Sequence, residues 1–110
     1  MKYSEFKDQL ICMDLDGTLC NGESWTEMGC LFAEPIQEHI DISNKLYISG
    51  AHIIINTARP EKFRHETEYW LSKHGIRYHA MNMNSKKCGS DFYCDDKALT
   101  LDQLINIKND

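Results

Sequence analysis

Three short apolar runs constrain the fold of this chain more than any other feature of its sequence. Residues 10–13, 53–55 and 92–94 are continuously apolar rather than alternating between apolar and polar side chains. Such runs are typical of strands that are covered on both faces in a parallel sheet. Residues 76–81 alternate instead, so we expect this strand at an edge of the sheet.

Helical segments are expected between these runs. Pro60 suits the first position of a helix and Gly75 its end. A second helix is expected from Pro35 to Gly50, and a third begins near Thr100. Strands that alternate with helices predict a doubly wound, Rossmann-like α/β sheet of about four parallel strands. The expected strand order is 3-2-1-4, with right-handed crossovers, flanking helices and no cap domain.

Length and charge limit the classes of function. The chain has 110 residues and a net charge of -5, so we expect one domain, residues 1–110, with a short flap at about 19–35. It has neither a bilayer-length apolar stretch nor the apolar centre of a signal peptide, which predicts a cytoplasmic protein with no membrane partner. The negative charge argues against nucleic acid as a partner.

The five cysteines are odd in number and predict no disulfide framework; Cys12 is expected to be a small buried hydrophobic residue.

Polar side chains follow three of the apolar runs, where each strand is expected to end. The carboxyl ends of parallel strands meet at one edge of the sheet, where such sheets bind ligands. Asp14 and Asp16 are two positions apart in an extended chain and therefore share one site. A cluster of carboxylates is stable when it binds a hard cation, and magnesium is the natural candidate. The polar residues at the three strand ends are Asp14, Asp16, Asn56, Thr57, Asp95 and Asp96.

A purely structural role is the alternative for these acids. Asp-Gly is a common turn pair, which fits Asp16 and Gly17. Asp95 and Asp96 fit the cap of a following helix. Neither alternative explains why two acids follow each of two buried strands, so we favour a shared site.

The chain resembles the haloacid dehalogenase-like phosphatases of the small, capless type. Residues 13–19, MDLDGTL, resemble the first motif of that family, and residues 53–57 resemble the second, a strand that ends in Thr. Residues 87–98, KCGSDFYCDDKA, resemble the stretch K-P-S-A-D-x-Y-I-D-D-K-A of small members, with Cys88 where Pro is usual. The resemblance covers about residues 8 to 106, and four motifs in order are more specific than one.

The resemblance implies magnesium-dependent hydrolysis of a phosphomonoester through an aspartyl-phosphate. Asp14 would attack phosphorus, and Asp16 would protonate the leaving oxygen and then activate water. Thr57 would bind the phosphoryl oxygens, and Lys87 would neutralise their charge. The substrate-binding residues implied are Thr57, Ala58, Arg59 and Lys87, and the metal-binding residues are Asp14, Asp16 through its main-chain carbonyl, Asp95, and Asp96 through metal-bound water.

The sequence is compatible with two roles for Arg59. Near a helix N-terminus, its guanidinium can grip an anionic substrate in a fork. Alternatively, it lies on the surface and pairs with Glu61 or Glu66.

The favoured substrate is a small phosphorylated metabolite such as a sugar or sugar-acid phosphate. The alternatives are a polynucleotide 3′-phosphate and a phosphoprotein. A rival of another class is a receiver-like phosphate-binding regulatory domain. That domain needs adjacent acids after its first strand and an Asp after its third, whereas this chain has Asp14-x-Asp16 and no Asp after Met81.

An open, capless site also predicts a homo-oligomer, a dimer or a tetramer, whose neighbouring subunit closes the site. The expected contact is the flap, which is rich in large apolar side chains. The alternative is that these side chains fold back on their own core. They are Trp25, Met28, Leu31 and Phe32.

Overall fold

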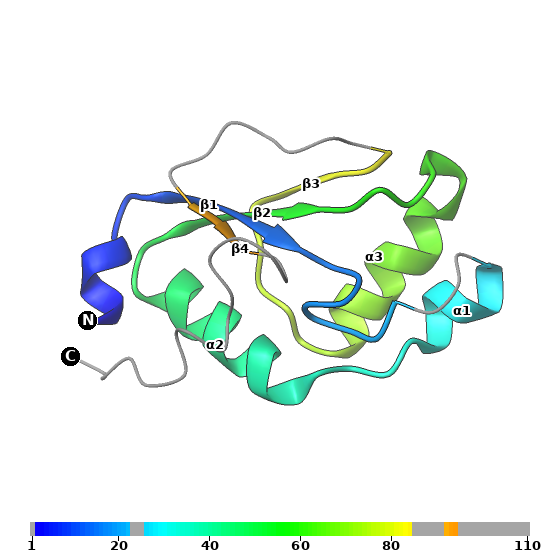
Figure 1. Cartoon of the computed structure of the whole chain (residues 1–110), viewed down its shortest axis with the longest axis horizontal. Helices are drawn as coiled ribbons and strands as arrows, with labels where there is room; N and C mark the ends of the chain where they lie inside the picture. The colour runs from blue at the N-terminus through cyan, green and yellow to red at the C-terminus, as the bar shows by residue number, and fades with distance from the viewer. Residues whose placement is uncertain (1, 23–25, 85–91, 95–110) are drawn as a thin grey trace.

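A computed structural model of the chain describes residues 2–22, 26–84 and 92–94 (Figure 1). Short 3-10 helices are labelled η. The elements, in chain order, are η1 (Tyr3–Phe6), β1 (Leu10–Asp14), α1 (Glu27–Phe32), α2 (Gln37–Ile48), β2 (His52–Asn56), η2 (Glu61–Phe63), α3 (Arg64–Lys73), β3 (Ala80–Asn82) and β4 (Phe92–Cys94).

The strands form a parallel sheet in which β1 and β2 are central. They are hydrogen-bonded in the order β3-β2-β1-β4, and the register sets Asp14 beside Asn56. Both crossovers, from β1 to β2 and from β2 to β3, step in the same direction along the sheet. Right-handed crossovers therefore put α2 and α3 on the same face, as Figure 1 shows. The expected α/β class, with a parallel sheet and flanking helices, is confirmed.

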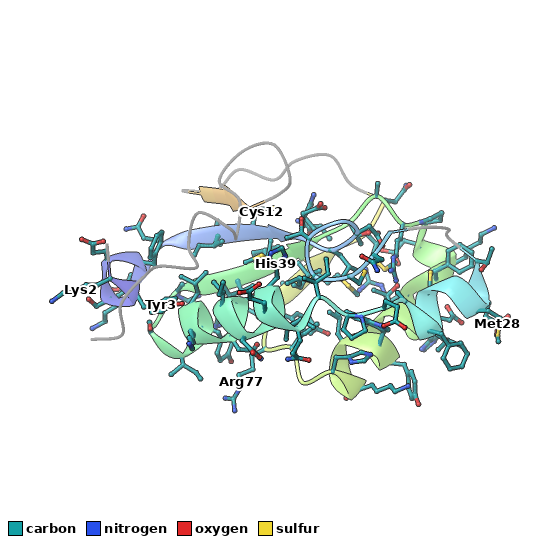
Figure 2. All side chains as sticks on the ribbon, turned by 60° about the horizontal axis from the view of Figure 1, so that its bottom comes forward. Lys2, Tyr3, Cys12, Met28, His39 and Arg77 are labelled. Atoms are coloured by element: carbon teal, nitrogen blue, oxygen red, sulfur yellow. The ribbon has the colours of Figure 1, made fainter. Side chains whose placement is uncertain are left out.

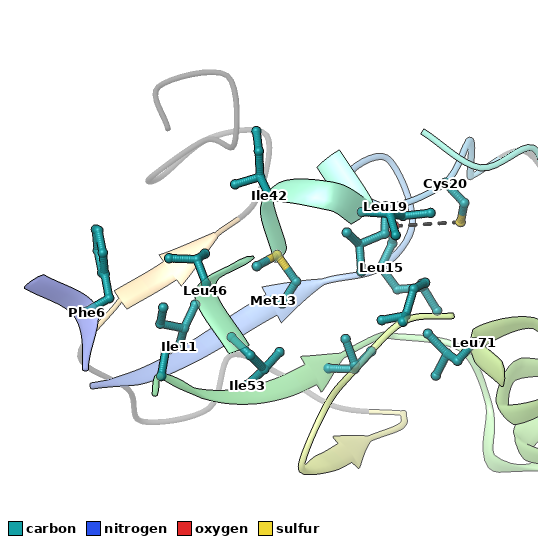
Figure 3. Packing of buried hydrophobic residues seen from close by; sticks show 14 of the residues in the cluster. Phe6, Ile11, Met13, Leu15, Leu19, Cys20, Ile42, Leu46, Ile53 and Leu71 are labelled. Carbon is teal, nitrogen blue, oxygen red and sulfur yellow. Dashed lines mark hydrogen bonds between the residues drawn. The ribbon is translucent and has the colours of Figure 1, made fainter. Parts of the chain in front are cut away.

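The core lies between the sheet and α2 (Figure 3). Ile11 and Met13 of β1 and Ile53 of β2 are fully buried, and Leu46 of α2 packs in the same cluster. Burial on both faces of β1 explains why its sequence is continuously apolar. Cys12 is fully buried as expected, but it is disulfide-bonded, which the cysteine pattern did not predict. Its partner sulfur lies outside the described side chains.

The edge strand differs from its prediction. Residues 76–81 were expected to be extended, whereas β3 spans Ala80–Asn82. Gly75 has a φ of +67° at the end of α3, and the Ile76 N–H donates to the carbonyl of Leu71 at 3.0 Å. The Arg77 N–H donates to Asn44 Oδ1 of α2 at 2.9 Å. These bonds hold the segment as a turn, so the ladder begins only after it.

The N-terminal turn η1 was not expected as an element. Tyr3 and Phe6 are each 3% exposed, and they extend the core at the end of β1 opposite the strand-end site. Their i, i+3 spacing is the sequence signal that predicts this burial.

No described stretch of the chain forms a second domain over the sheet. Between β1 and α2 the described residues form a tight turn and the six-residue helix α1. Between β2 and β3 they form η2 and α3. The third predicted helix, near residue 100, lies outside the described residues.

Within the part of the chain that the structure describes, no helix has the length and apolar character needed to cross a membrane.

Candidate active site

Asp14 and Asp16 lie at the carboxyl end of β1, in a turn that closes on itself. Gly17 has a φ of +83°, a conformation that Gly adopts without a steric cost. Thr18 Oγ1 donates to Asp14 Oδ2 at 3.3 Å. The buried Cys20 donates its S–H to the carbonyl of Leu15, the dashed line in Figure 3. The turn thus orients one oxygen of Asp14 and returns the chain beside Asp16.

Thr57 meets Asp16 from the end of β2. It follows Asn56, which pairs with Asp14 in the sheet. Thr57 Oγ1 donates to Asp16 Oδ2 at 3.2 Å and accepts the main-chain N–H of Arg59 at 3.1 Å. The structure therefore brings together three of the residues predicted for the site. Ala58, the next predicted residue, is exposed in the same loop.

The structure contradicts the surface interpretation of Arg59. It is 1% exposed. Its Nη2 donates to Asp16 Oδ1 at 2.8 Å, and its Nε lies 3.1 Å from Oδ2 of the same carboxylate. Glu61 pairs with Arg64 instead, at 2.7 Å between Arg64 Nη2 and Glu61 Oε1. Arg59 is therefore not a surface residue, and its guanidinium is held by Asp16; binding of substrate by Arg59 stays a prediction.

Arg59 keeps its charge although it is buried. Burial alone would lower the pKa of Arg59, but the hydrogen bonds and the negative charge of Asp16 hold that pKa above its ordinary value. A buried ion is tolerated when its partner and further hydrogen bonds satisfy it. Thr67 Oγ1 of α3 accepts from Arg59 Nη1 at 3.1 Å and supplies one of those bonds.

Cys20 is part of the same cluster and is fully buried. Its Sγ lies 3.7 Å from Asp16 Oδ1 and 3.7 Å from Arg59 Nη2. Burial, with the charge of Asp16 adding to it, raises the pKa of Cys20 from 9.0 to about 12. Only the thiolate is strongly reactive, so Cys20 acts here as a small, weakly donating side chain.

Two residues that lie beside the site were not predicted from the sequence. The backbone of Gly22 lies against Asp16, and an added Cβ would be 2.7 Å from Asp16 Cβ. His39 of α2 places its Nδ1 2.6 Å from the carbonyl oxygen of Thr18. Neither had a local signal, because a Gly in a polar stretch fits an ordinary turn and a single His in a helix fits ordinary packing.

The flap contains α1, which packs against α3. Thr26 caps the helix by accepting from the Gly29 N–H at 2.9 Å. Met28 and Phe32 are 64% and 60% exposed, and Figure 2 shows Met28 on α1 at the edge of the molecule. Leu31 is partly buried. Self-association through the flap stays a prediction.

The other predicted site residues, Lys87, Asp95 and Asp96, lie outside the described residues, as does Trp25. Within the described ranges, no group of three or more His, Cys, Asp or Glu side chains is arranged to hold a metal ion. The carboxylate of Asp14 is a hard oxygen donor of the kind that magnesium prefers. The carboxylate of Asp16 is occupied by Arg59, so its main-chain carbonyl suits a metal better.

No protein-family model matches this chain, and no curated protein matches its sequence. Solved structures do share its fold. A structural-genomics target from Vibrio cholerae is 25% identical with a TM-score of 0.67, over 92% of this chain and 89% of that one. A hypothetical protein from Xanthomonas campestris is 17% identical with a TM-score of 0.52.

A chain of the Pnkp1/Rnl/Hen1 RNA repair complex is also similar. It is 17% identical with a TM-score of 0.68, over 99% of this chain and 44% of that one. This chain therefore spans less than half the length of that relative. At such identities the likeness shows the fold alone: this chain is similar, as a Rossmann-like α/β unit, to one part of a larger RNA repair protein.

Proposed function

We propose that this protein is a magnesium-dependent phosphomonoester hydrolase that acts through an aspartyl-phosphate, as a capless member of the haloacid dehalogenase-like phosphatases. The observation that carries the proposal is the meeting of Asp14, Asp16 and Thr57 at the ends of β1 and β2. Thr57 Oγ1 lies 3.2 Å from Asp16 Oδ2. Two carboxylates and a hydroxyl at this edge of a parallel sheet suit a nucleophile, an acid/base and a phosphoryl ligand.

The proposed reaction has two steps. A carboxylate oxygen of Asp14 attacks phosphorus while Asp16 gives its proton to the leaving oxygen, and the alcohol departs. Asp16 then takes a proton from water, which attacks the phosphorus of the aspartyl-phosphate and releases inorganic phosphate. Thr18 steadies Asp14, because its Oγ1 donates to Asp14 Oδ2 at 3.3 Å. Magnesium, when bound, would reduce the repulsion between the two anions.

The substrate class has two candidates. The net charge of -5 favours a small phosphorylated metabolite over a polyanion. The fold shared with a chain of an RNA repair complex favours a polynucleotide 3′-phosphate. A panel of sugar phosphates, phosphopeptides and oligonucleotides with a 3′-phosphate separates the classes by kcat/KM.

The proposed chemistry is tested with an aryl phosphate in the presence of magnesium. We expect turnover that EDTA abolishes. Asp14→Asn should abolish it, because an amide cannot form the aspartyl-phosphate. Asp16→Asn should lose between about a hundredfold and ten-thousandfold and still bind tetrafluoroberyllate, because Asp14 remains. Asp41→Asn, at an exposed position of α2 bonded to Gln37, is the matched control and should keep full activity.

Two results would contradict this proposal. Turnover in excess EDTA would reject the metal. An aspartyl-phosphate that forms on Asp14 and persists without turnover would favour the receiver-like domain.

The assignment of Lys87 to the proposed site is tested by comparing alanine variants of the neighbouring Lys86 and Lys87. Lys87→Ala should cost about a hundredfold or more in kcat/KM, because it removes a charge that stabilises the transition state. Lys86→Ala should cost less than about threefold, as expected for a solvated charge. A large loss for Lys86→Ala with Lys87→Ala nearly silent would shift the alignment of this loop by one residue.

A further inference from the structure

We infer that Arg59 is a positioning residue that fixes the carboxylate of Asp16 for proton transfer, and that it does not bind substrate. The inference rests on the proposed function, because it concerns the acid/base step of that reaction. It assigns a role to a buried arginine that the sequence led us to expect in the substrate site.

The contacts between the two side chains form a fork. Arg59 Nη2 donates to Asp16 Oδ1 at 2.8 Å, and Arg59 Nε lies 3.2 Å from Oδ1 and 3.1 Å from Oδ2. The Arg59 side chain is 2% exposed and that of Asp16 is 15% exposed. A planar guanidinium with two donors on one carboxylate fixes both its distance and its rotation.

Hydrogen bonds hold both the guanidinium and the main chain of Arg59. Its Nη1 donates to Thr67 Oγ1 at 3.1 Å, and Thr67 is fully buried in α3. Its main-chain N–H donates to Thr57 Oγ1 at 3.1 Å, and its carbonyl accepts the Asn84 N–H at 2.7 Å. The guanidinium therefore has little freedom to swing toward a substrate without breaking these bonds.

Asp16 is also confined by backbone. The Cα position of Gly22 is so close that an added Cβ would lie 2.7 Å from Asp16 Cβ and 3.2 Å from Asp16 Cα. Asp16 is thus held between the chain that returns from its own turn and the guanidinium of Arg59. A carboxylate held from both sides is pre-set in one orientation, which general acid catalysis requires.

The test uses the leaving group of the substrate. A nitrophenolate leaves readily without a proton, whereas an alkoxide does not. Removing the guanidinium should therefore lower kcat/KM far more for substrates whose leaving group needs a proton than for substrates whose leaving group departs without one. Because kcat/KM covers the steps up to formation of the aspartyl-phosphate, it isolates this effect from the later hydrolysis.

We expect Arg59→Met to lower kcat/KM about a hundredfold on an alkyl phosphate and less than about tenfold on 4-nitrophenyl phosphate. The inhibition constant of inorganic phosphate, which has no leaving group, should change less than about twofold. Arg59→Lys keeps the charge but loses the fork, so it should recover part of the alkyl phosphate rate. Arg64→Met, which removes an exposed guanidinium paired with Glu61, is the control and should leave every value unchanged.

Thr67→Val tests the same inference without changing Arg59 and keeps it testable if Arg59→Met does not fold. It removes the acceptor of Arg59 Nη1, and we expect a smaller loss with the same dependence on leaving group. A loss that is equal for all leaving groups would overturn the inference, as would a phosphate inhibition constant raised about tenfold, the result expected of a substrate ligand. A wild-type protein that hydrolyses no phosphate ester would contradict the proposed function itself.

Discussion

Asp16 is the residue on which most contacts of the candidate site converge. Its carboxylate accepts from Thr57 and Arg59 and lies 3.7 Å from the sulfur of Cys20, and the backbone of Gly22 confines it from the other side. Removing one partner of a buried ion pair typically destabilises a protein by about 3–5 kcal/mol. Arg59 is thus expected to matter for stability as well as for the proposed acid/base step, so its variants need both measurements.

The close approach of Gly22 predicts an activity defect from a single methyl group. Gly22→Ala would place a Cβ 2.7 Å from Asp16 Cβ, so Asp16 or its turn must shift. A shift of about 1 Å in a reacting group can cost about a hundredfold, and we expect kcat on an alkyl phosphate to fall by at least about tenfold.

Gly75→Ala is the matched control for that variant. Gly75 has a φ of +67° at the end of α3, and a Cβ there would meet nothing within 4 Å. It should cost about 1 kcal/mol of stability through backbone strain and leave kcat unchanged. Equal kcat for Gly22→Ala and the wild type would show that Asp16 tolerates the displacement.

At the scale of elements, α3 connects the flap to the sheet. Thr67, Trp70 and Leu71 form its buried face. Phe63 and His74, which flank this helix, are only partly buried. Trp70 Nε1 donates to the carbonyl of Ala33, just after α1, at 2.8 Å. One side chain of α3 thereby holds the end of the flap, while Thr67 of the same helix holds Arg59.

Replacing this indole tests the connection. Trp70→Phe keeps an aromatic ring in the core but leaves the Ala33 carbonyl without its donor. We expect a loss of about 1–3 kcal/mol in urea unfolding, with faster amide hydrogen exchange in α1 than in α2. Tyr69→Phe, at an exposed neighbouring position, should change neither. Unchanged exchange in α1 would mean that other contacts of α1 with α3 hold the flap.

At the scale of the whole molecule, we expect the free energy of unfolding to depend on pH in the alkaline range. The reason is that several weakly acidic side chains, which are neutral when protonated, are buried or partly buried. Burial raises the pKa of Cys20 from 9.0 to about 12, with the charge of Asp16 adding to the shift. Burial also raises the pKa of Tyr3 and of Tyr78 above 10.0. The folded chain therefore keeps protons that the unfolded chain releases in this range.

The sign of the dependence follows from that difference. The stabilising effect is complete below about pH 9 and is lost as the pH rises from about 9 toward 12. We expect the free energy of unfolding, measured in urea, to fall across this window, and Cys20→Ala to show a smaller fall. A free energy of unfolding that stayed constant from pH 8 to pH 11 would contradict it.

Much of the fold and part of the site were determined by local sequence. Residues 11–13 of β1 are fully buried, and in β2 the partly buried Ile54 lies between the buried Ile53 and Ile55. The continuously apolar runs alone predicted these two parallel strands. Once the strands were parallel, Asp14, Asp16 and Thr57 had to lie at one edge. These predictions depend on patterns within a few residues, which a sequence displays directly.

Only the tertiary structure decided the burial and the partner of Arg59, the close approach of Gly22 and the start of β3. Arg59 lies 43 positions from Asp16 in the chain, and no local pattern reveals which of several acids a guanidinium will meet. The turn before β3 depends on Asn44 of α2, 33 positions from Arg77. Such contacts arise where packing brings distant segments together, so they cannot be predicted from the residues that are neighbours in the sequence.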